Sequence, residues 1–160
     1  MAKSTGKPTR IIETFILEIN SVSHSPRFQI IVTQGVLELL VNTMIEHNCK
    51  NADRITERAR DYPYSVKLVI LHEKGLISDF HFQQLDALRS IRNKAAHEAQ
   101  FVLTQQMLSP FKAVTSFGRN VKFDEPKNFP ILCGDTVLGF WNHGVRLFAP
   151  IFEPHLFKGQ

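Results

Sequence analysis

The sequence predicts an all-α protein, an antiparallel helical bundle with a final C-terminal helix. Apolar residues recur at three- and four-residue spacing along most of the 160 residues, and the alternating pattern of strands is scarce. Apolar residues are 43% of the chain and charged residues 21%, which suits a folded core and not a disordered chain. We expect one helical domain over 11–160 after a flexible basic tail over 1–10.

The first half of the chain carries signals for four helices. They are expected over 8–20, from Pro26 to about Cys49, over 52–60, and from Pro63 to Gly75. Ser25 before Pro26 is typical of a helix start, with Ser25 as the cap. Apolar residues cover more than half of the helix that begins there, so it should lie at the centre of the bundle. Gly75 should end the fourth helix.

The second half predicts further helices separated by a loop. They are expected over about 79–103, over 105–117 with an interruption at Pro110, and in a last helix through Val137, Trp141, Val145 and Phe148 that frays near Pro150. Ser78 can cap the first of these, with Asp79 well placed against the helix dipole. The segment 118–130 should be a loop, because a hairpin there would have no sheet to join.

Composition excludes several classes of protein. No run of eighteen apolar residues suggests a membrane span, and the polar start leads into no signal peptide, so we expect a cytoplasmic protein. Cys49 and Cys133 should be free, mostly buried thiols. Metal-ligand spacings are missing, so no metal or other cofactor is expected. The net charge of +4 permits contact with nucleic acid but does not demand it.

One segment suggests a function. Arg92 is followed by Asn93, three further residues and His97, all within the predicted helix over 79–103. This arrangement resembles the Arg-polar-x-x-x-His signature of the HEPN superfamily. A Leu-rich helix, a Gly turn and an Arg-Asn-x-x-Ala-His helix come in the same order in bacterial proteins near the mannitol-operon-repressor-like branch. The resemblance covers about 25–104 and implies a HEPN-like core there.

The resemblance implies RNA binding and a metal-independent endoribonuclease of the toxin or defence type. His97 would be the general base or acid, because an imidazole titrates near neutral pH. Arg92 would hold the scissile phosphate with its planar guanidinium. Asn93 would orient His97 or donate to the phosphate, and the product would carry a 2′,3′-cyclic phosphate. Arg89 and Lys94 are the candidates for additional nucleic-acid contacts.

Helix geometry raises an objection to this site. Five residues turn about 500° along an ideal helix, so Arg92 and His97 should point about 140° apart. Either a local π-bulge or a symmetric dimer, in which both subunits line one cleft, would bring them together. The resemblance favours the homodimer.

Two other functions fit the same residues. The motif could be structural within a non-catalytic regulatory or protein-interaction module, or within a purely structural dimer, since buried polar groups need partners in any case. The expected partners are therefore a second copy, RNA, or an antitoxin or regulatory protein. Two basic segments are weaker candidates for RNA contact: Arg54, Arg58 and Arg60, expected on a solvated face, and Lys112 to Phe129, whose Phe residues could simply pin a loop.

Overall fold

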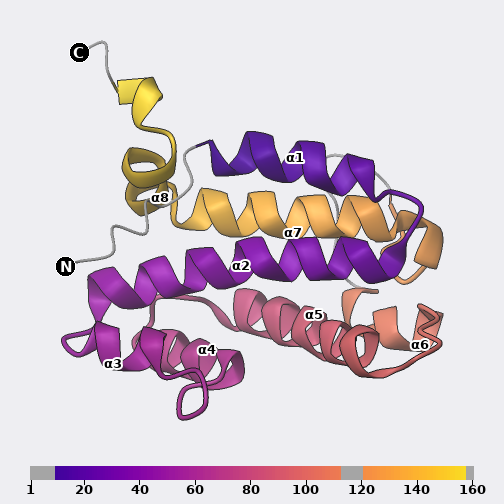
Figure 1. The fold of residues 1–160 in the computed structure, drawn as a ribbon, viewed down its shortest axis with the longest axis horizontal. Coiled ribbons are helices and arrows are strands. Elements are labelled where there is room, and N and C mark those ends of the chain that lie inside the picture. The colour runs from indigo at the N-terminus through magenta and orange to yellow at the C-terminus, as the bar shows by residue number, and fades with distance from the viewer. Residues whose placement is uncertain (1–9, 113–120, 158–160) are drawn as a thin grey trace.

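The computed structural model describes residues 10–112 and 121–157, and these contain helices and no strands (Figure 1). The helices are α1 (Ile11–Ser21), α2 (Pro26–Asn48), α3 (Ala52–Glu57), α4 (Tyr64–Glu73), α5 (Asp79–His97), α6 (Gln105–Leu108), α7 (Phe129–His143) and α8 (Val145–Phe152). Single 3₁₀ turns occupy Ser109–Phe111, Pro126–Asn128 and Pro154–Phe157. The all-α prediction is confirmed. Most of the predicted tail and residues 113–120 lie outside the described residues.

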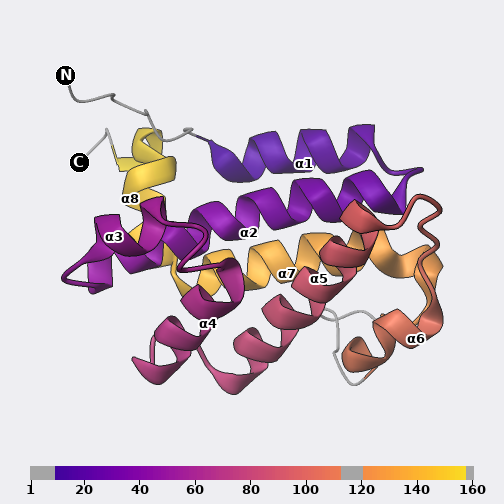
Figure 2. The same cartoon turned by 60° about the horizontal axis from the view of Figure 1, so that its bottom comes forward.

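Helix α2 lies at the centre of the bundle, as its apolar surface predicted. It contacts α1, α3, α4, α5, α7 and α8. Figure 1 shows α1, α2 and α7 running side by side, with α3, α4 and α5 below them. Seen after rotation, α5 lies between α4 on one side and α6 on the other (Figure 2). Helix α5 is therefore bordered by different elements along its two flanks.

The apolar character of α2 has a second consequence. By length and composition alone this helix could cross a membrane, which the absence of an unbroken apolar run did not anticipate. Of its most apolar window, however, 56% is buried inside the protein. Ile30, Leu37, Leu40, Val41 and Ile45 are completely buried there. The composition of α2 is thus that of a core helix, which is consistent with a soluble protein.

Three predicted helix boundaries can be checked against backbone hydrogen bonds. Pro26 occupies the first turn of α2, but the Ser25 side chain makes no capping hydrogen bond. Gly75 has a φ of 68°, and its N–H donates to the His72 carbonyl at 2.8 Å. The next N–H, from Leu76, donates to Leu71 at 2.9 Å, which completes a Schellman ending of α4. The Ser78 hydroxyl accepts from the His81 N–H at 3.3 Å and caps α5 as predicted.

Helix α5 ends at His97, six residues before the predicted boundary at 103. Arg27, at the start of α2, explains this difference. Its guanidinium donates to the carbonyl of Glu98 at 2.5 Å and to that of Ala99 at 3.1 Å. These two carbonyls are bonded to Arg27 and not to the N–H groups of a further turn of α5. A long-range contact thus marks the end of α5, where the sequence has neither Gly nor Pro. Ala95 is the last buried residue of α5, and Ala99 is exposed.

The predicted last helix is two helices. Helix α7 ends at His143 and α8 begins at Val145, with a change of direction between them (Figure 1). A side chain at position 144 would collide with the ring of Phe148, so Gly144 permits this tight turn. The helix does not fray at Pro150. Helix α8 continues through this residue to Phe152.

Smaller differences concern the short elements. The charged helix α3 ends at Glu57 rather than at residue 60. The piece predicted over 105–117 is a four-residue helix followed by the 3₁₀ turn at Pro110, and its remainder lies outside the described residues. Residues 121–128 form irregular chain with one 3₁₀ turn, in agreement with the predicted loop.

Candidate polar site on helix α5

Three of the five predicted site residues line one cavity of about 260 Å³ between α2, α4 and α5. We call it the polar cavity and define it by Gln34, Glu38, Tyr64, Arg89, Arg92 and Asn93. The α5 residues occupy adjacent turns of one helix face, as spacings of three and four residues dictate. Gln34 and Glu38 lie one turn apart on α2 for the same reason. The cavity is therefore assembled from two facing helices and the start of α4.

The two arginines of the polar cavity are held differently. Arg89 Nε donates to Asp86 Oδ1 at 2.8 Å, so its position is fixed by a carboxylate on the same helix. Arg92 is exposed and donates only to its neighbour, with Nη1 3.4 Å from Asn93 Oδ1. Among the described residues it has no acidic partner. The Arg92 guanidinium thus keeps most of its donors available for an anionic group.

Two buried atoms in this cavity have no hydrogen-bond partner among the described residues. These are Oε1 of Gln34, a residue only 5% exposed, and the hydroxyl of Tyr64. Burial raises the pKa of Tyr64 well above its ordinary value, so the phenol stays protonated. The nearby Gln34 side chain opposes this shift, although the geometry leaves both atoms unbonded. Buried polar atoms without partners are rare and point to a missing ligand or water.

His97 does not join this group. It is exposed at the last position of α5 and is not part of the polar-cavity lining. The helix is regular from Asp79 to His97, without a π-helical turn, so of the two alternatives the π-bulge is excluded. Within one chain the structure brings together Arg89, Arg92 and Asn93, and leaves His97 outside. A meeting of Arg92 and His97 therefore requires a second copy.

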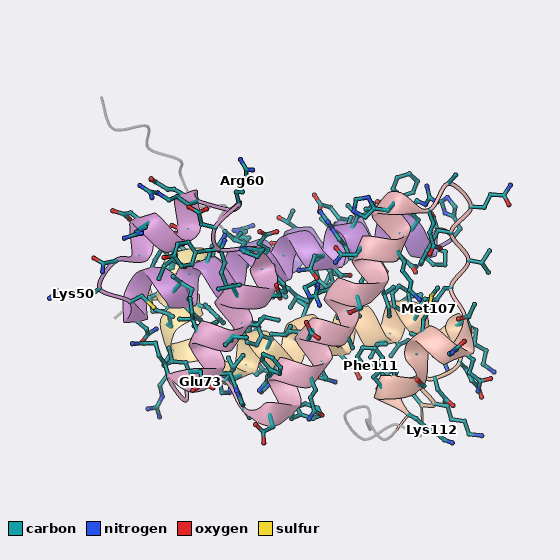
Figure 3. All side chains as sticks on the ribbon, turned by 90° about the horizontal axis from the view of Figure 1, so that it is seen from below. Lys50, Arg60, Glu73, Met107, Phe111 and Lys112 are labelled. Carbon is teal, nitrogen blue, oxygen red and sulfur yellow. The ribbon has the colours of Figure 1, made fainter. Side chains whose placement is uncertain are left out.

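Lys94 faces a different cavity, of about 610 Å³, on the other flank of α5. We call it the apolar cavity and define it by Phe80, Phe82, Ile91, Lys94, Met107 and Phe111. Figure 3 shows Met107 and Phe111 on the side of α5 away from α4. Lys94 therefore lies on a different flank of α5 from Arg92 and Asn93, and its predicted contact with nucleic acid stays a prediction.

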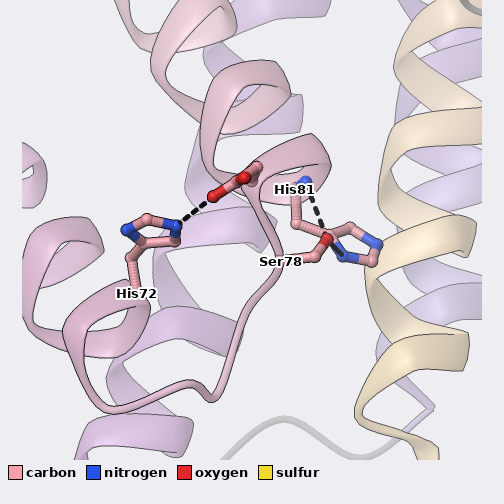
Figure 4. A network of polar contacts seen from close by, with 4 residues as sticks. His72, Ser78 and His81 are labelled. Carbon is pink, nitrogen blue, oxygen red and sulfur yellow. Dashed lines mark hydrogen bonds and ion pairs between the residues drawn. The ribbon is translucent and has the colours of Figure 1, made fainter.

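Histidines gather at the opposite end of α5, and Figure 4 shows the polar contacts there between α4 and the start of α5. His72 Nε2 lies 2.6 Å from Asp79 Oδ1, and the Ser78 hydroxyl lies 3.0 Å from His81 Nδ1. The rings of His81 and His143 are 4.5 Å apart between centroids. Burial, and then His143, lower the pKa of His81. The His72–Asp79 contact joins α4 to α5, and the His81–His143 contact joins α5 to α7, so we interpret this cluster as structural.

The predictions for the remaining basic residues, metal ligands and cysteines can also be compared with the structure. Arg54, Arg58 and Arg60 are all exposed, which agrees with a solvated face. Within 10–112 and 121–157, no three His, Cys, Asp or Glu side chains are arranged to hold a metal ion. Both cysteines are free, and burial raises the pKa of Cys133 to about 12, so this thiol is unreactive.

The sequence did not reveal the residues of α2 and α4 that face α5 across the polar cavity. A signal for two of them does exist, because Gln34 and Glu38 are a polar pair at i,i+4 spacing in an otherwise apolar central helix. Tyr64 gave no such signal. Its role depends on how α4 packs, which no local pattern reveals.

No protein-family model matches this chain, and no curated protein or solved structure is significantly similar to it. The resemblance to the HEPN superfamily therefore stays a prediction, and the site must be interpreted from its own chemistry.

Proposed function

We propose that this domain binds RNA through the polar cavity, as a HEPN-like RNA-binding protein of the cytoplasm. The observation that carries the proposal is the Arg92 guanidinium, which is exposed and has no acidic partner within 10–112 and 121–157, at a cavity that it shares with Arg89 and Asn93. Guanidinium donors match two phosphate oxygens at once. Arg89, held by Asp86, and the Asn93 amide add further donors beside that contact.

Cleavage is the second part of the proposal, and it requires a homodimer. His97 of the partner subunit would remove the ribose 2′-OH proton while Arg92 holds the phosphate. The 2′-oxygen would then attack phosphorus, the bond to the 5′-oxygen would break, and that oxygen would take up a proton. The products are a 2′,3′-cyclic phosphate and a free 5′-hydroxyl, and the reaction consumes no metal, oxidant or water.

An apolar surface near His97 supports such a dimer. Phe28 and Ile31 are 55% and 43% exposed on one face of α2. Their neighbour Arg27 holds the two carbonyls directly after His97. Exposed apolar residues beside a polar site are typical of protein interfaces. A second copy seated there would lie next to the end of α5 that carries His97.

Single-residue variants test binding and cleavage separately. Wild-type protein should bind a labelled single-stranded RNA and cut it in EDTA. Arg92→Ala should lower both affinity and cleavage, and His97→Ala should abolish cleavage while affinity persists. Arg146→Ala is the control, because Arg146 is exposed on α8 and far along the chain from the cavity. Uncut RNA at several pH values would remove the endoribonuclease, and absence of binding would remove the RNA function altogether.

A non-catalytic regulatory or protein-interaction module is the second candidate. The apolar cavity supports it, because Phe80 at its edge is 52% exposed and Phe82, Met107 and Phe111 line its walls. Apolar cavities of this size suit a protein side chain or another apolar group. In this case the partner would be an antitoxin or a regulatory protein. Phe80→Ala, and not Arg92→Ala, would then weaken the interaction in a pull-down from cells.

A further inference from the structure

The polar cavity contains a carboxylate and two guanidinium groups that do not pair across it. Glu38, from α2, forms no ion pair among the described residues, although it lines the same cavity as Arg89 and Arg92. Arg89 bonds to Asp86 instead. Opposite charges that face one cavity without meeting leave room for a group that satisfies both. That group must carry hydrogen-bond donors for the carboxylate and acceptors for the guanidinium groups.

The buried atoms of the cavity narrow the choice further. Gln34 is only 5% exposed, yet in the part of the chain that the structure describes neither its amide oxygen nor the Tyr64 hydroxyl has a hydrogen-bond partner. An anion alone would satisfy the arginines and repel Glu38, and it would leave an amide oxygen without a donor. A ligand with several N–H groups and at least one acceptor would provide hydrogen-bond partners for all five side chains.

The size of the cavity limits the ligand to a single ring system. Its volume of about 260 Å³ lies below the ~300 Å³ at which pockets for drug-sized ligands begin. Sequence-specific proteins recognise RNA mostly through unpaired bases that they hold by their Watson–Crick edges. Among the four bases only guanine places two adjacent N–H donors, at N1 and N2, opposite one carboxylate, with an acceptor at O6 beside them.

We propose that the polar cavity receives an unpaired guanine of single-stranded RNA, with Glu38 accepting from N1–H and N2–H and Arg89 donating to O6. Gln34 and Tyr64 supply the remaining polar contacts at the cavity wall. Arg92, more exposed, holds the adjoining phosphate. This inference rests on the proposed function, because the phosphate contact keeps the strand at the cavity. It adds base selection to a site that would otherwise bind RNA of any sequence.

The test compares fluorescein-labelled oligoadenosine with the same strand carrying one central guanosine, by fluorescence anisotropy. The guanosine strand should bind the wild-type protein about tenfold more tightly or better, since a bidentate contact discriminates bases to that extent. Replacing that guanosine by inosine, which lacks the N2 amino group, should remove a large part of the difference without any change to the protein.

Glu38→Gln should bring the ratio of the two affinities close to one. Glu73→Gln is the matched control, because Glu73 is exposed at the end of α4, away from the cavity (Figure 3); it should keep the wild-type ratio. Equal wild-type affinity for both strands would overturn base selection and leave RNA binding intact. Binding of neither strand would overturn the proposed function and this inference together.

Discussion

The two cavities beside α5 share a helix and differ in almost everything else. The polar cavity takes Arg89, Arg92 and Asn93 from α5 and meets polar residues of α2 and α4. The apolar cavity takes Phe80, Phe82, Ile91 and Lys94 from α5 and faces Met107 and Phe111 around α6. The α5 residues that line the polar cavity are all polar, whereas those on the other flank are mixed. The comparison teaches that α5 and the elements facing it decide the chemistry of each cavity together.

The cavities also differ in how their atoms are satisfied. The polar cavity keeps two buried polar atoms without partners, which lowers the stability of the fold. Among the apolar-cavity residues, no buried polar atom lacks a partner in the described structure. A local loss of stability of this kind is typical of sites built for a ligand.

The largest effect on stability should come from the buried core of α5, the helix that lines both cavities. Leu88 is completely buried on α5, so Leu88→Ala should lower the free energy of unfolding by about 2–5 kcal/mol. Urea denaturation measures this change. Ser90→Ala, at an exposed position of the same helix, should change it by less than ~0.5 kcal/mol. A small loss in Leu88→Ala would mean that the position of α5 does not depend on this packing.

A smaller change in the free energy of unfolding, of opposite sign, is expected in the polar cavity. Tyr64→Phe removes a buried hydroxyl without a partner and should raise the free energy of unfolding by about 1 kcal/mol. Tyr62→Phe, at a half-buried position just before α4, is the control and should change little. If Tyr64→Phe destabilised the protein, the hydroxyl would have a hydrogen-bond partner in solution. The polar cavity would then hold no unsatisfied hydroxyl for a ligand to bind.

The pH dependence of stability should report on the histidine cluster at the start of α5. Burial and His143 lower the pKa of His81 below its usual 6.5, so the unfolded chain binds this proton more readily than the folded one. Its contribution to stability is therefore complete above pH 6.5 and is lost as the pH falls through the lowered pKa.

Urea midpoints at about pH 8 and about pH 5 measure that loss. His81→Gln should flatten the difference between them, whereas His24→Gln, at an exposed position, should leave it unchanged. If the difference between the two midpoints were unchanged in His81→Gln, His81 would be free to ionise in the folded protein. The histidine cluster would then not hold α5 against α7.

The smallest effect on stability is expected at the rim of the polar cavity. Arg92 is exposed and has a single long hydrogen bond, so Arg92→Ala should change the free energy of unfolding by less than ~0.5 kcal/mol. A purely structural motif predicts a loss of about 1–3 kcal/mol instead. Thermal or urea unfolding distinguishes the two values. The larger loss would favour a structural role for the motif over RNA binding.

Most of the helical architecture could be predicted because its signals are local. The Pro26 start of α2, the Ser78 cap and the Gly75 ending depend on neighbouring backbone groups, and all three were found where expected. The end of α5 could not be predicted, because Arg27 sets it from 71 residues away. Nor could the inward direction of α4, where Lys67 is buried in contact with Asn42 while Val69 is 47% exposed.

The candidate site was predicted in part. The spacing of Arg89, Arg92 and Asn93 on one helix was enough to bring them together. The helix angle also indicated that Arg92 and His97 point apart, but not that His97 lies outside the polar cavity. Gln34, Glu38 and Tyr64 were missed because they come from other helices. Their meeting with α5 is a contact between segments distant in sequence.

The sequence by itself determined that the chain is helical, which helix lies at its centre, and which polar residues share a face of α5. Periodicity, caps and turns are interactions over at most a few residues, so they can be derived from the chain alone. Only the tertiary structure decided that an unpaired carboxylate and two unsatisfied polar atoms stand opposite Arg92. That arrangement depends on the packing of α2 and α4 against α5, where distant side chains meet at distances no local pattern encodes.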